Sequence, residues 1–410
     1  MTENDAEAAT GTRSSKIRDY LRTLPERIGR PPSTGAYIPQ VDGLRFLAIF
    51  IVVVWHASLR ASRYARDLSP DATSPTNWYA YFPHGEIGVV AFFFISGYII
   101  AQPYFRPQTR RYSALLFYGK RLRRIVPPYL VVLIAGFLSL TLIGYRPVGA
   151  NSFELSPVPM SESVVASAVY LHGLIFNSPS RIDPPMWSLE IEMQFYFLFP
   201  YIILIYTFVS SRHRLLYGAL IIILTVILAN ACYELYGFDG RYRWGLLKHA
   251  GAFLTGIVVA DAEASKPKPA VRSIYDWLWL GGLALLLLIG LSMTEVDTLY
   301  ASVVSSFMAD FGSLLAVVAI YYGAMYGKLG RQVFGAPWLC LIGTMCYSIY
   351  LVHVPLMQVV SDVVLRRLAL HSAPAIWGVW LLVLLPVSFV SATVFYVLVE
   401  RPFMNRRQRR

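Results

Sequence analysis

The sequence predicts an all-α, polytopic membrane protein: a bundle of about ten transmembrane helices with both termini in the cytoplasm. Of its 410 residues, 56% are hydrophobic and only 15% are charged, and the mean hydropathy is +0.51. Several apolar runs approach the length of about 20 residues that a helix needs to cross the hydrocarbon core. These values exclude a water-soluble globular domain, in which about a quarter of the residues are charged.

The predicted spans follow the apolar runs in chain order. They are residues 42–60, 87–105, 127–144, 187–209, 215–233, 245–262, 275–293, 301–325, 337–359 and 375–399. We expect the third span to begin at the proline pair Pro127–Pro128, because proline suits the first turn of a helix. The apolar piece at 164–177 is short for a span, so we expect it to be re-entrant or interfacial.

The distribution of basic residues orients the bundle. The segment Arg106–Arg124 holds seven basic residues and no acidic one, which places it in the cytoplasm. Ten spans then put the arginine-rich C-terminal tail inside and the acidic loop near Glu295 outside, whereas an eleventh span would send the tail outside. The domain prediction is a polar, partly disordered cytoplasmic tail (1–36), a transmembrane domain (37–403) and a basic tail (404–410).

The net charge of +12 does not indicate a nucleic-acid partner, and the three cysteines do not indicate a metal or redox site. The basic residues cluster just beyond apolar runs, which is typical of membrane topology and not of nucleic-acid binding. The cysteines lie in or beside apolar runs, and no pair has metal-ligand or redox spacing. The sequence therefore predicts neither a metal site nor a nucleic-acid partner.

Arg45 and His56 in the first span are the central candidates for chemistry. A helix turns about 100° per residue, so residues eleven apart share one face, roughly 16 Å apart along the axis. Such groups are costly inside a membrane unless they face the bundle interior or a watery cavity. The alternatives are an interfacial anchor for Arg45 and a hydrogen bond between helices for His56.

Other polar residues fall inside or at the ends of predicted spans. Glu192 is a functional candidate because it is an intramembrane carboxylate, with a structural ion pair as the alternative. His353 is either catalytic or a hydrogen-bonded core histidine. Arg121 and Arg124 could bind phosphates through bidentate contacts, or could serve as topology signals alone.

Six blocks, in order, resemble the membrane acyltransferase family 3. They are the Arg45-x10-His56 pair, GEIGVVAFFFISGYII (85–100), RLRRIVPPY (121–129), WSLEIEMQFY (187–196), GTMCYSIYLVHVP (343–355) and YVLVERPF (396–403). The sequence departs from the family pattern at four positions: Val90, Tyr98, Met193 and Cys346.

The resemblance implies an acyl-CoA-dependent O-acyltransferase in the bacterial inner (cytoplasmic) membrane. The acyl group, typically acetyl, would pass from acetyl-CoA at the cytoplasmic side to a hydroxyl of a cell-envelope glycan or glycolipid, such as a trehalose glycolipid of the mycolate type. Acetyl-CoA would be a substrate, with no tightly bound cofactor. A second copy of the chain and a separate extracytoplasmic protein are further partners to test for.

Each block supplies expected site residues. His56 is the expected general base, with Glu192 orienting it, and Arg45 is a further catalytic candidate on the same helix face. The donor-binding residues would be Arg45, Arg121, Arg124, Tyr129 and Ser96. The matched blocks also contribute His353, Trp187, Tyr350 and Glu400.

Several alternatives stay open at this point. The acceptor could instead be a small secreted metabolite such as a macrolide. The buried Arg, His and Glu residues could form the proton relay of a transporter, or the chain could be a non-catalytic membrane scaffold. The sequence does not distinguish direct transfer from a covalent acyl-serine intermediate.

Overall fold

The computed structural model describes residues 23–25, 27–29, 37–68, 81–105, 113–146, 156–236, 243–293, 303–368 and 373–404. Several features of the predicted topology lie outside these ranges. They are most of the N-terminal tail, the basic residues Arg106, Arg110 and Arg111, the acidic loop with Glu295 and Asp297, and residues 405–410.

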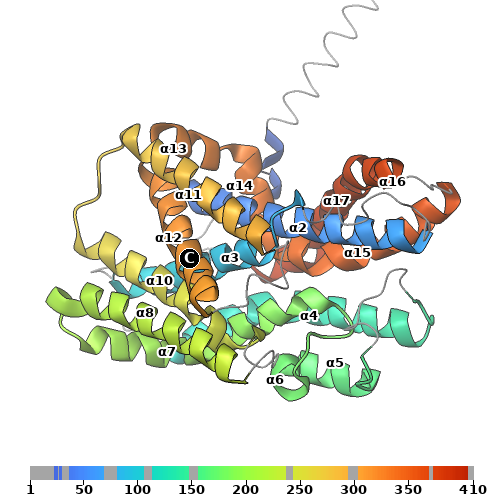
Figure 1. Cartoon of the computed structure of the whole chain (residues 1–410), viewed down its shortest axis with the longest axis horizontal. Helices are drawn as coiled ribbons and strands as arrows, with labels where there is room; N and C mark the ends of the chain where they lie inside the picture. Colours follow the sequence, from blue (N-terminus) through green and yellow to red (C-terminus); the bar gives the residue numbers. More distant parts are fainter. Residues whose placement is uncertain are drawn as a thin grey trace, which may run out of the picture.

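The regular structure in the described ranges is entirely helical, which confirms the predicted class (Figure 1). The longer helices are α2 (Pro39–Leu68), α3 (Glu86–Ala101), α4 (Ala114–Thr141), α7 (Trp187–Phe208), α8 (Ser211–Tyr236), α10 (Leu246–Ser265), α11 (Ile274–Ser292), α12 (Val303–Tyr326), α15 (Cys346–Leu368) and α17 (Leu385–Phe395). The shorter elements are η2 (Gln102–Phe105), α5 (Met160–Ala168), α6 (His172–Phe176), η3 (Pro184–Met186), α13 (Lys328–Phe334), α14 (Pro337–Thr344), α16 (Ala373–Val379), η5 (Trp380–Leu384), η6 (Tyr396–Glu400) and η7 (Arg401–Phe403).

Nine helical segments in the described ranges are long and apolar enough to cross a membrane. They are Pro39–Tyr64, Glu86–Phe105, Ala114–Thr141, Pro184–Phe208, Ser211–Leu235, Ile274–Ser292, Ser306–Tyr326, Cys346–Val364 and Ala375–Phe403. Helix α10 has 20 residues but is more polar. Its charged side chains are paired inside the bundle: Lys248 with Asp310 at 2.5 Å, and Asp261 with Arg214 at 3.5 Å. With α10, the count reaches the ten spans expected.

The described residues near the two ends of the chain contact one another. The guanidinium of Arg401 donates to the backbone carbonyl of Arg27 at 2.8 Å. The cytoplasmic side remains a prediction from the basic residues.

Helices α2, α3 and α15 form the centre of the molecule, and α10 packs closely on α3 (Figure 1). Glycines permit this close approach. A Cβ on Gly97 would lie 2.1 Å from the carbonyl oxygen of Phe253, and one on Gly256 would lie 2.2 Å from that of Phe94. Such small residues let membrane helices approach backbone to backbone. Helix α3 is therefore fixed in position along one wall of the region described below.

The third span begins earlier than predicted. Helix α4 starts at Ala114, and Pro127 and Pro128 lie in its interior. The prediction was wrong because a membrane helix tolerates proline when neighbouring groups can satisfy the freed carbonyls. As a consequence, Arg121 and Arg124 lie on the same continuous helix as the membrane-spanning residues and not in a loop.

The ninth span is shorter than predicted. The run 337–359 is divided at Met345 into α14 and α15, and only Cys346–Val364 is a candidate span. The break follows from packing: α14 lies against the start of α2, and a Cβ on Gly343 would lie 1.7 Å from the carbonyl oxygen of Asp42. Apolar sequence alone does not reveal such a change of direction.

The segment 164–177 does not cross the membrane. It contains most of α5 and all of α6, helices of nine and five residues that are too short to span. They lie beside α4, at one end of the molecule (Figure 1). Val165, Val169 and Ile175 are exposed, as expected for an interfacial hairpin.

Candidate active site

Two adjoining cavities lie between the central helices. The inner cavity has a volume of about 90 Å³ and is lined by α2, α3, α4, α7 and α15. The outer cavity has a volume of about 280 Å³ and lies between α2, α3, the start of α7 and the residues just before α10. Val89 and Tyr350 line both cavities, so a single layer of side chains separates them.

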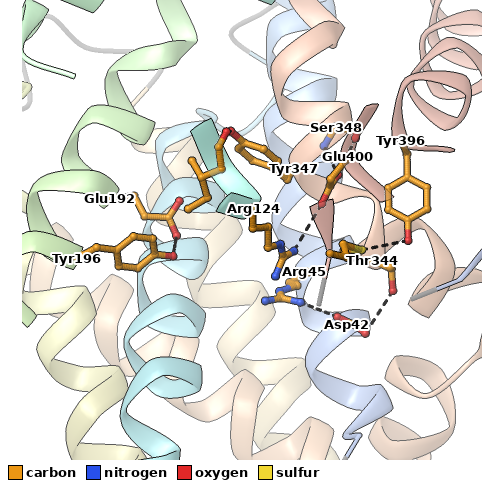
Figure 2. Close-up of polar contacts among 12 residues, drawn as sticks. Asp42, Arg45, Arg124, Glu192, Tyr196, Thr344, Tyr347, Ser348, Tyr396 and Glu400 are labelled. Atoms are coloured by element: carbon orange, nitrogen blue, oxygen red, sulfur yellow. Dashed lines mark hydrogen bonds and ion pairs between the residues drawn. The ribbon is translucent and has the colours of Figure 1, made fainter. Parts of the chain in front are cut away.

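The inner cavity is lined by three arginines, Arg45, Arg121 and Arg124. Arg45 donates to Asp42 at 2.8 Å, and the other oxygen of this buried carboxylate accepts from Thr344 at 3.3 Å. Figure 2 shows Arg45 and Arg124 reaching toward one another from their two helices. A guanidinium at this depth needs a partner, and Asp42 supplies it one turn before Arg45 on the same helix.

The second arginine, Arg124, is paired with a carboxylate from η6, near the C-terminus. Glu400 is fully buried and lies 3.6 Å from Arg124. Its other oxygen accepts from the backbone N–H of Ser348 at 3.2 Å and from the Ser348 hydroxyl at 2.6 Å. The residues Tyr396–Glu400 form a π-helical turn, a local widening that is frequent at functional sites. Glu400 thus positions Arg124 without lining the cavity itself.

Glu192 forms the opposite wall of the inner cavity. One of its oxygens accepts from the Ser96 hydroxyl at 2.8 Å and also from the Tyr196 hydroxyl. Arg121 lies over the Tyr196 ring, with its guanidinium carbon 5.5 Å from the ring centroid, within the range of a cation–π contact. Tyr196 therefore contacts a carboxylate through its hydroxyl and an arginine through its ring face (Figure 2 shows the Glu192–Tyr196 pair).

His56 lines the outer cavity and is held by His353. The Nδ1 of His353 lies 2.7 Å from the carbonyl oxygen of Tyr350 and 3.1 Å from that of Ile349. A carbonyl only accepts hydrogen bonds, so Nδ1 carries the proton, and Nε2 of the neutral ring must accept. At 3.0 Å, His56 Nδ1 then donates to His353 Nε2. This series of hydrogen bonds leaves the Nε2 lone pair of His56 without a proton, the form that a general base requires.

His84 supplies a complementary group in the outer cavity. Its Nδ1 accepts from the backbone N–H of Glu86 at 3.2 Å, so the neutral ring carries its proton on Nε2. Burial lowers the pKa of His84 below its ordinary value, which favours this neutral form. The outer cavity therefore has one imidazole that can accept a proton and one that can donate a hydrogen bond.

The structure separates the predicted site residues into groups. Arg45, Arg121, Arg124, Ser96 and Glu192 line the inner cavity. His56 and Trp187 line the outer cavity, and Tyr350 lines both. His353 and Glu400 lie behind the walls as the partners of His56 and Arg124.

Two of these residues are not where the expected roles require them. Glu192 was expected to orient His56, but its hydrogen bonds go to Ser96 and Tyr196 in the inner cavity, and the partner of His56 is His353. Tyr129 lines neither cavity: its buried hydroxyl donates to the carbonyl of Ser167 at 2.8 Å. Matching depth along separate helices did not establish which side chains meet.

Sequence reasoning also missed several lining residues. Arg60 lines the outer cavity four residues after His56, and Asp42, the partner of Arg45, lies behind the wall three residues before it, so helical spacing could have identified both. Arg243 and Trp244 reach the outer cavity from the residues before α10, and His84 reaches it from the residues before α3. No local pattern identifies these three, because only the fold brings them to His56.

Comparisons with known proteins identify the family. Residues 38–399 match the family described as "Acyltransferase domain". The chain is 26% identical over 353 residues to O-acetyltransferase OatA of Staphylococcus aureus (strain NCTC 8325 / PS 47), covering 80% of this chain and 51% of the relative. A putative O-acetyltransferase of S. aureus strain COL is 22% identical over 337 residues, covering 77% of this chain and 50% of the relative. The chain thus spans about half the length of these relatives. No solved structure matches it.

Proposed function

Because the chain belongs to the acyltransferase-domain family, we propose that it transfers an acyl group, typically acetyl, from acyl-CoA at the cytoplasmic side of a bacterial inner membrane to a hydroxyl of a cell-envelope glycan or glycolipid. One observation carries this proposal: an arginine-lined cavity adjoins a cavity lined by His56, whose Nδ1 is hydrogen-bonded to His353. Cations attract the phosphates of CoA, and the imidazole can activate a hydroxyl.

The inner cavity fits the narrow end of the donor. At about 90 Å³ it is much smaller than the few hundred cubic ångströms that a whole cofactor of this size needs. The nucleotide would remain at the cytoplasmic mouth, and the acylated pantetheine arm would pass Arg121 and Arg124. The thioester would then reach the layer formed by Val89 and Tyr350, beyond which His56 lies.

The reaction itself needs one base and one hydrogen-bond donor. The Nε2 of His56 takes the proton of the acceptor hydroxyl as that oxygen attacks the thioester carbonyl carbon. The tetrahedral intermediate collapses with cleavage of the C–S bond, and the His56 imidazolium returns the proton to the CoA sulfur. The products are the ester and free CoA.

Neighbouring residues support this step. His353 accepts from His56 Nδ1 and so fixes the tautomer whose Nε2 is basic, the role that a carboxylate plays in a serine-protease triad. His84 would donate its Nε2–H to the oxygen of the tetrahedral intermediate. Ser96 is a weaker candidate for that donation, because its hydroxyl proton is directed to Glu192.

The test uses the full chain, purified in lipid nanodiscs, with acetyl-CoA and extracted envelope glycans and glycolipids. We expect release of free CoA that depends on the acceptor, with the acetylated product identified by mass spectrometry. Wild-type protein that binds acetyl-CoA but transfers its acetyl group to none of these acceptors would contradict the proposal. His213 is exposed and lines neither cavity, so His213→Ala serves as the matched control for replacement of His56.

A further inference from the structure

The outer cavity has a charge that the acyl-transfer step does not use. Three arginines, Arg60, Arg63 and Arg243, line it together with a single carboxylate, Glu86. Arg60 is only 3% exposed, so it is not a surface charge that solvent screens. A partly enclosed cavity whose lining carries more charges of one sign concentrates ligands of the opposite sign.

Helix geometry sets the distance between these charges and the base. Arg60 and Arg63 follow His56 by four and seven residues on α2, so they share its face. At a rise of 1.5 Å per residue, they lie about 6 and 10 Å further along the helix axis. Arg243 faces the same space from the residues before α10. Arg60 and Arg63 therefore lie beyond the base, on the side away from the inner cavity.

Aromatic rings line the cavity beside Arg243. Trp187 and Trp244 pack with their ring centroids 4.9 Å apart, and the Arg243 guanidinium carbon lies 4.9 Å from the Trp244 ring centroid. Flat rings of this kind provide rigid apolar faces against which the C–H faces of a sugar ring can pack. Cations beside indole rings match a ligand that combines a saccharide ring with a negative charge.

We propose that the acceptor is an acidic carbohydrate: a sugar with a carboxylate or phosphate about 6–10 Å from the hydroxyl that is acylated. This inference rests on the proposed function for the position of the reacting hydroxyl. The anion would contact Arg63 and Arg243 through charge-assisted hydrogen bonds, while the sugar ring packs on Trp187 and Trp244. The same contacts would hold the hydroxyl at His56 Nε2.

The experiment compares three disaccharides that differ in one group. They are methyl cellobioside and its analogues with a carboxylate or a phosphate at C6 of the terminal ring. Binding to the full chain in nanodiscs is measured by calorimetry, and acetyl transfer from acetyl-CoA is measured in parallel. We expect at least one acidic disaccharide to bind about tenfold tighter than the neutral one, the usual effect of a hydrogen bond to a charged group.

Variants locate the effect. Arg63→Gln and Arg243→Gln should each remove most of the preference for the acidic disaccharide and leave the affinity for the neutral one within about twofold. Arg146→Gln is the matched control, because Arg146 is exposed beyond the end of α4 and lines neither cavity. The carboxylate and phosphate analogues distinguish the two kinds of anion, and tighter binding of either supports the inference.

Two results would overturn the inference: equal affinity for all three disaccharides, or an acidic preference that persists in the Arg63→Gln, Arg243→Gln double variant. Equal affinities with acetylation of all three disaccharides would overturn the acidic acceptor and leave the acyltransferase function standing. Selective binding of an acidic disaccharide without any acetyl transfer would support the binding site and count against the proposed reaction.

Discussion

The inner and outer cavities hold their ionisable side chains in different ways. In the inner cavity, each of two arginines is paired with a buried carboxylate. Arg45 pairs with Asp42 of the same helix, and Arg124 pairs with Glu400 of η6. In the outer cavity, His56 is held by another neutral imidazole and, through it, by a backbone carbonyl. The outer cavity is also about three times larger, 280 against 90 Å³.

This difference corresponds to two chemical tasks. A fixed cation must keep its charge to bind an anion, and a neighbouring carboxylate stabilises that charge within the membrane. A general base must stay neutral until it takes a proton, and a carboxylate beside it would favour the charged form. The two cavities therefore use different partners, and variants on one side should leave the other side intact.

The largest expected effect is on the base. His56→Ala should lower kcat for acyl transfer by about 10²–10⁴-fold, the usual contribution of a general base. The affinity for acetyl-CoA should be unchanged, because His56 does not line the inner cavity. Single-turnover transfer and calorimetry of donor binding measure the two quantities. A comparable loss of donor affinity would show that the cavities do not act separately.

His353 should be second in magnitude. His353→Ala removes the acceptor for His56 Nδ1–H, and we expect kcat to fall by roughly 10–100-fold, as for other residues that orient a reacting group. KM for both substrates should change little. His353→Gln should retain more activity than His353→Ala, because an amide oxygen can still accept the hydrogen bond. Equal activity in the two variants would indicate a packing role only.

Gly97→Ala should affect both cavities together, since α3 lines both. The added Cβ would lie 2.1 Å from the carbonyl oxygen of Phe253, which forces α3 and α10 apart. We expect a loss of about 1–3 kcal/mol in stability, measured as a lower Tm in detergent. Gly119→Ala is the control, because a Cβ there meets no atom within 4 Å. An unchanged Tm for Gly97→Ala would show that the helices can separate at little cost.

Arg121 tests the inner cavity alone. Arg121→Gln should raise KM for acetyl-CoA about tenfold, the effect of one lost charge-assisted hydrogen bond, while acceptor KM stays constant. Arg123 lies on the same helix but is exposed and lines neither cavity, so Arg123→Gln is the matched control. If the two variants behaved alike, Arg121 would be a topology signal only. Arg124→Gln is less selective, because it also leaves the buried Glu400 without this partner.

The smallest expected effect concerns the hairpin beside the outer cavity. The Nδ1–H of His172 donates to the carbonyl of Ser178 at 2.8 Å, one residue before the lining residue Pro179, and the Nε2 of the neutral ring accepts from the Ser163 hydroxyl at 2.9 Å. Burial lowers the pKa of His172 below its ordinary value. The unfolded hairpin therefore binds a proton more readily than the folded one, and the hairpin loses stability as the pH falls below about 6.5.

Hydrogen exchange of the α6 amides, corrected for the intrinsic rate, checks this dependence between pH 7.5 and 5.5. We expect weaker protection at the lower pH in the wild type and a flatter response in His172→Gln. The same pH dependence in both proteins would assign it to another group.

The amino-acid sequence by itself determined the class, the approximate number of spans and the stripe that joins Arg45 to His56. A bilayer requires each spanning segment to satisfy its own backbone hydrogen bonds, so apolar length translates directly into helices. The fixed period of a helix places residues eleven apart on one face without reference to any other segment. The six sequence blocks and their order likewise indicated the family without reference to the tertiary structure.

Only the tertiary structure decided which side chains meet between helices. Glu192 contacts Ser96 and not His56, Pro127 lies inside α4, and the run at 337–359 bends at Met345. Each of these outcomes depends on how far one helix shifts or tilts against another, and that is set by close contacts such as Gly97 on Phe253 and Gly343 on Asp42. Periodicity along one segment contains no information about such displacements, so the partner of the catalytic candidate had to come from the packed fold.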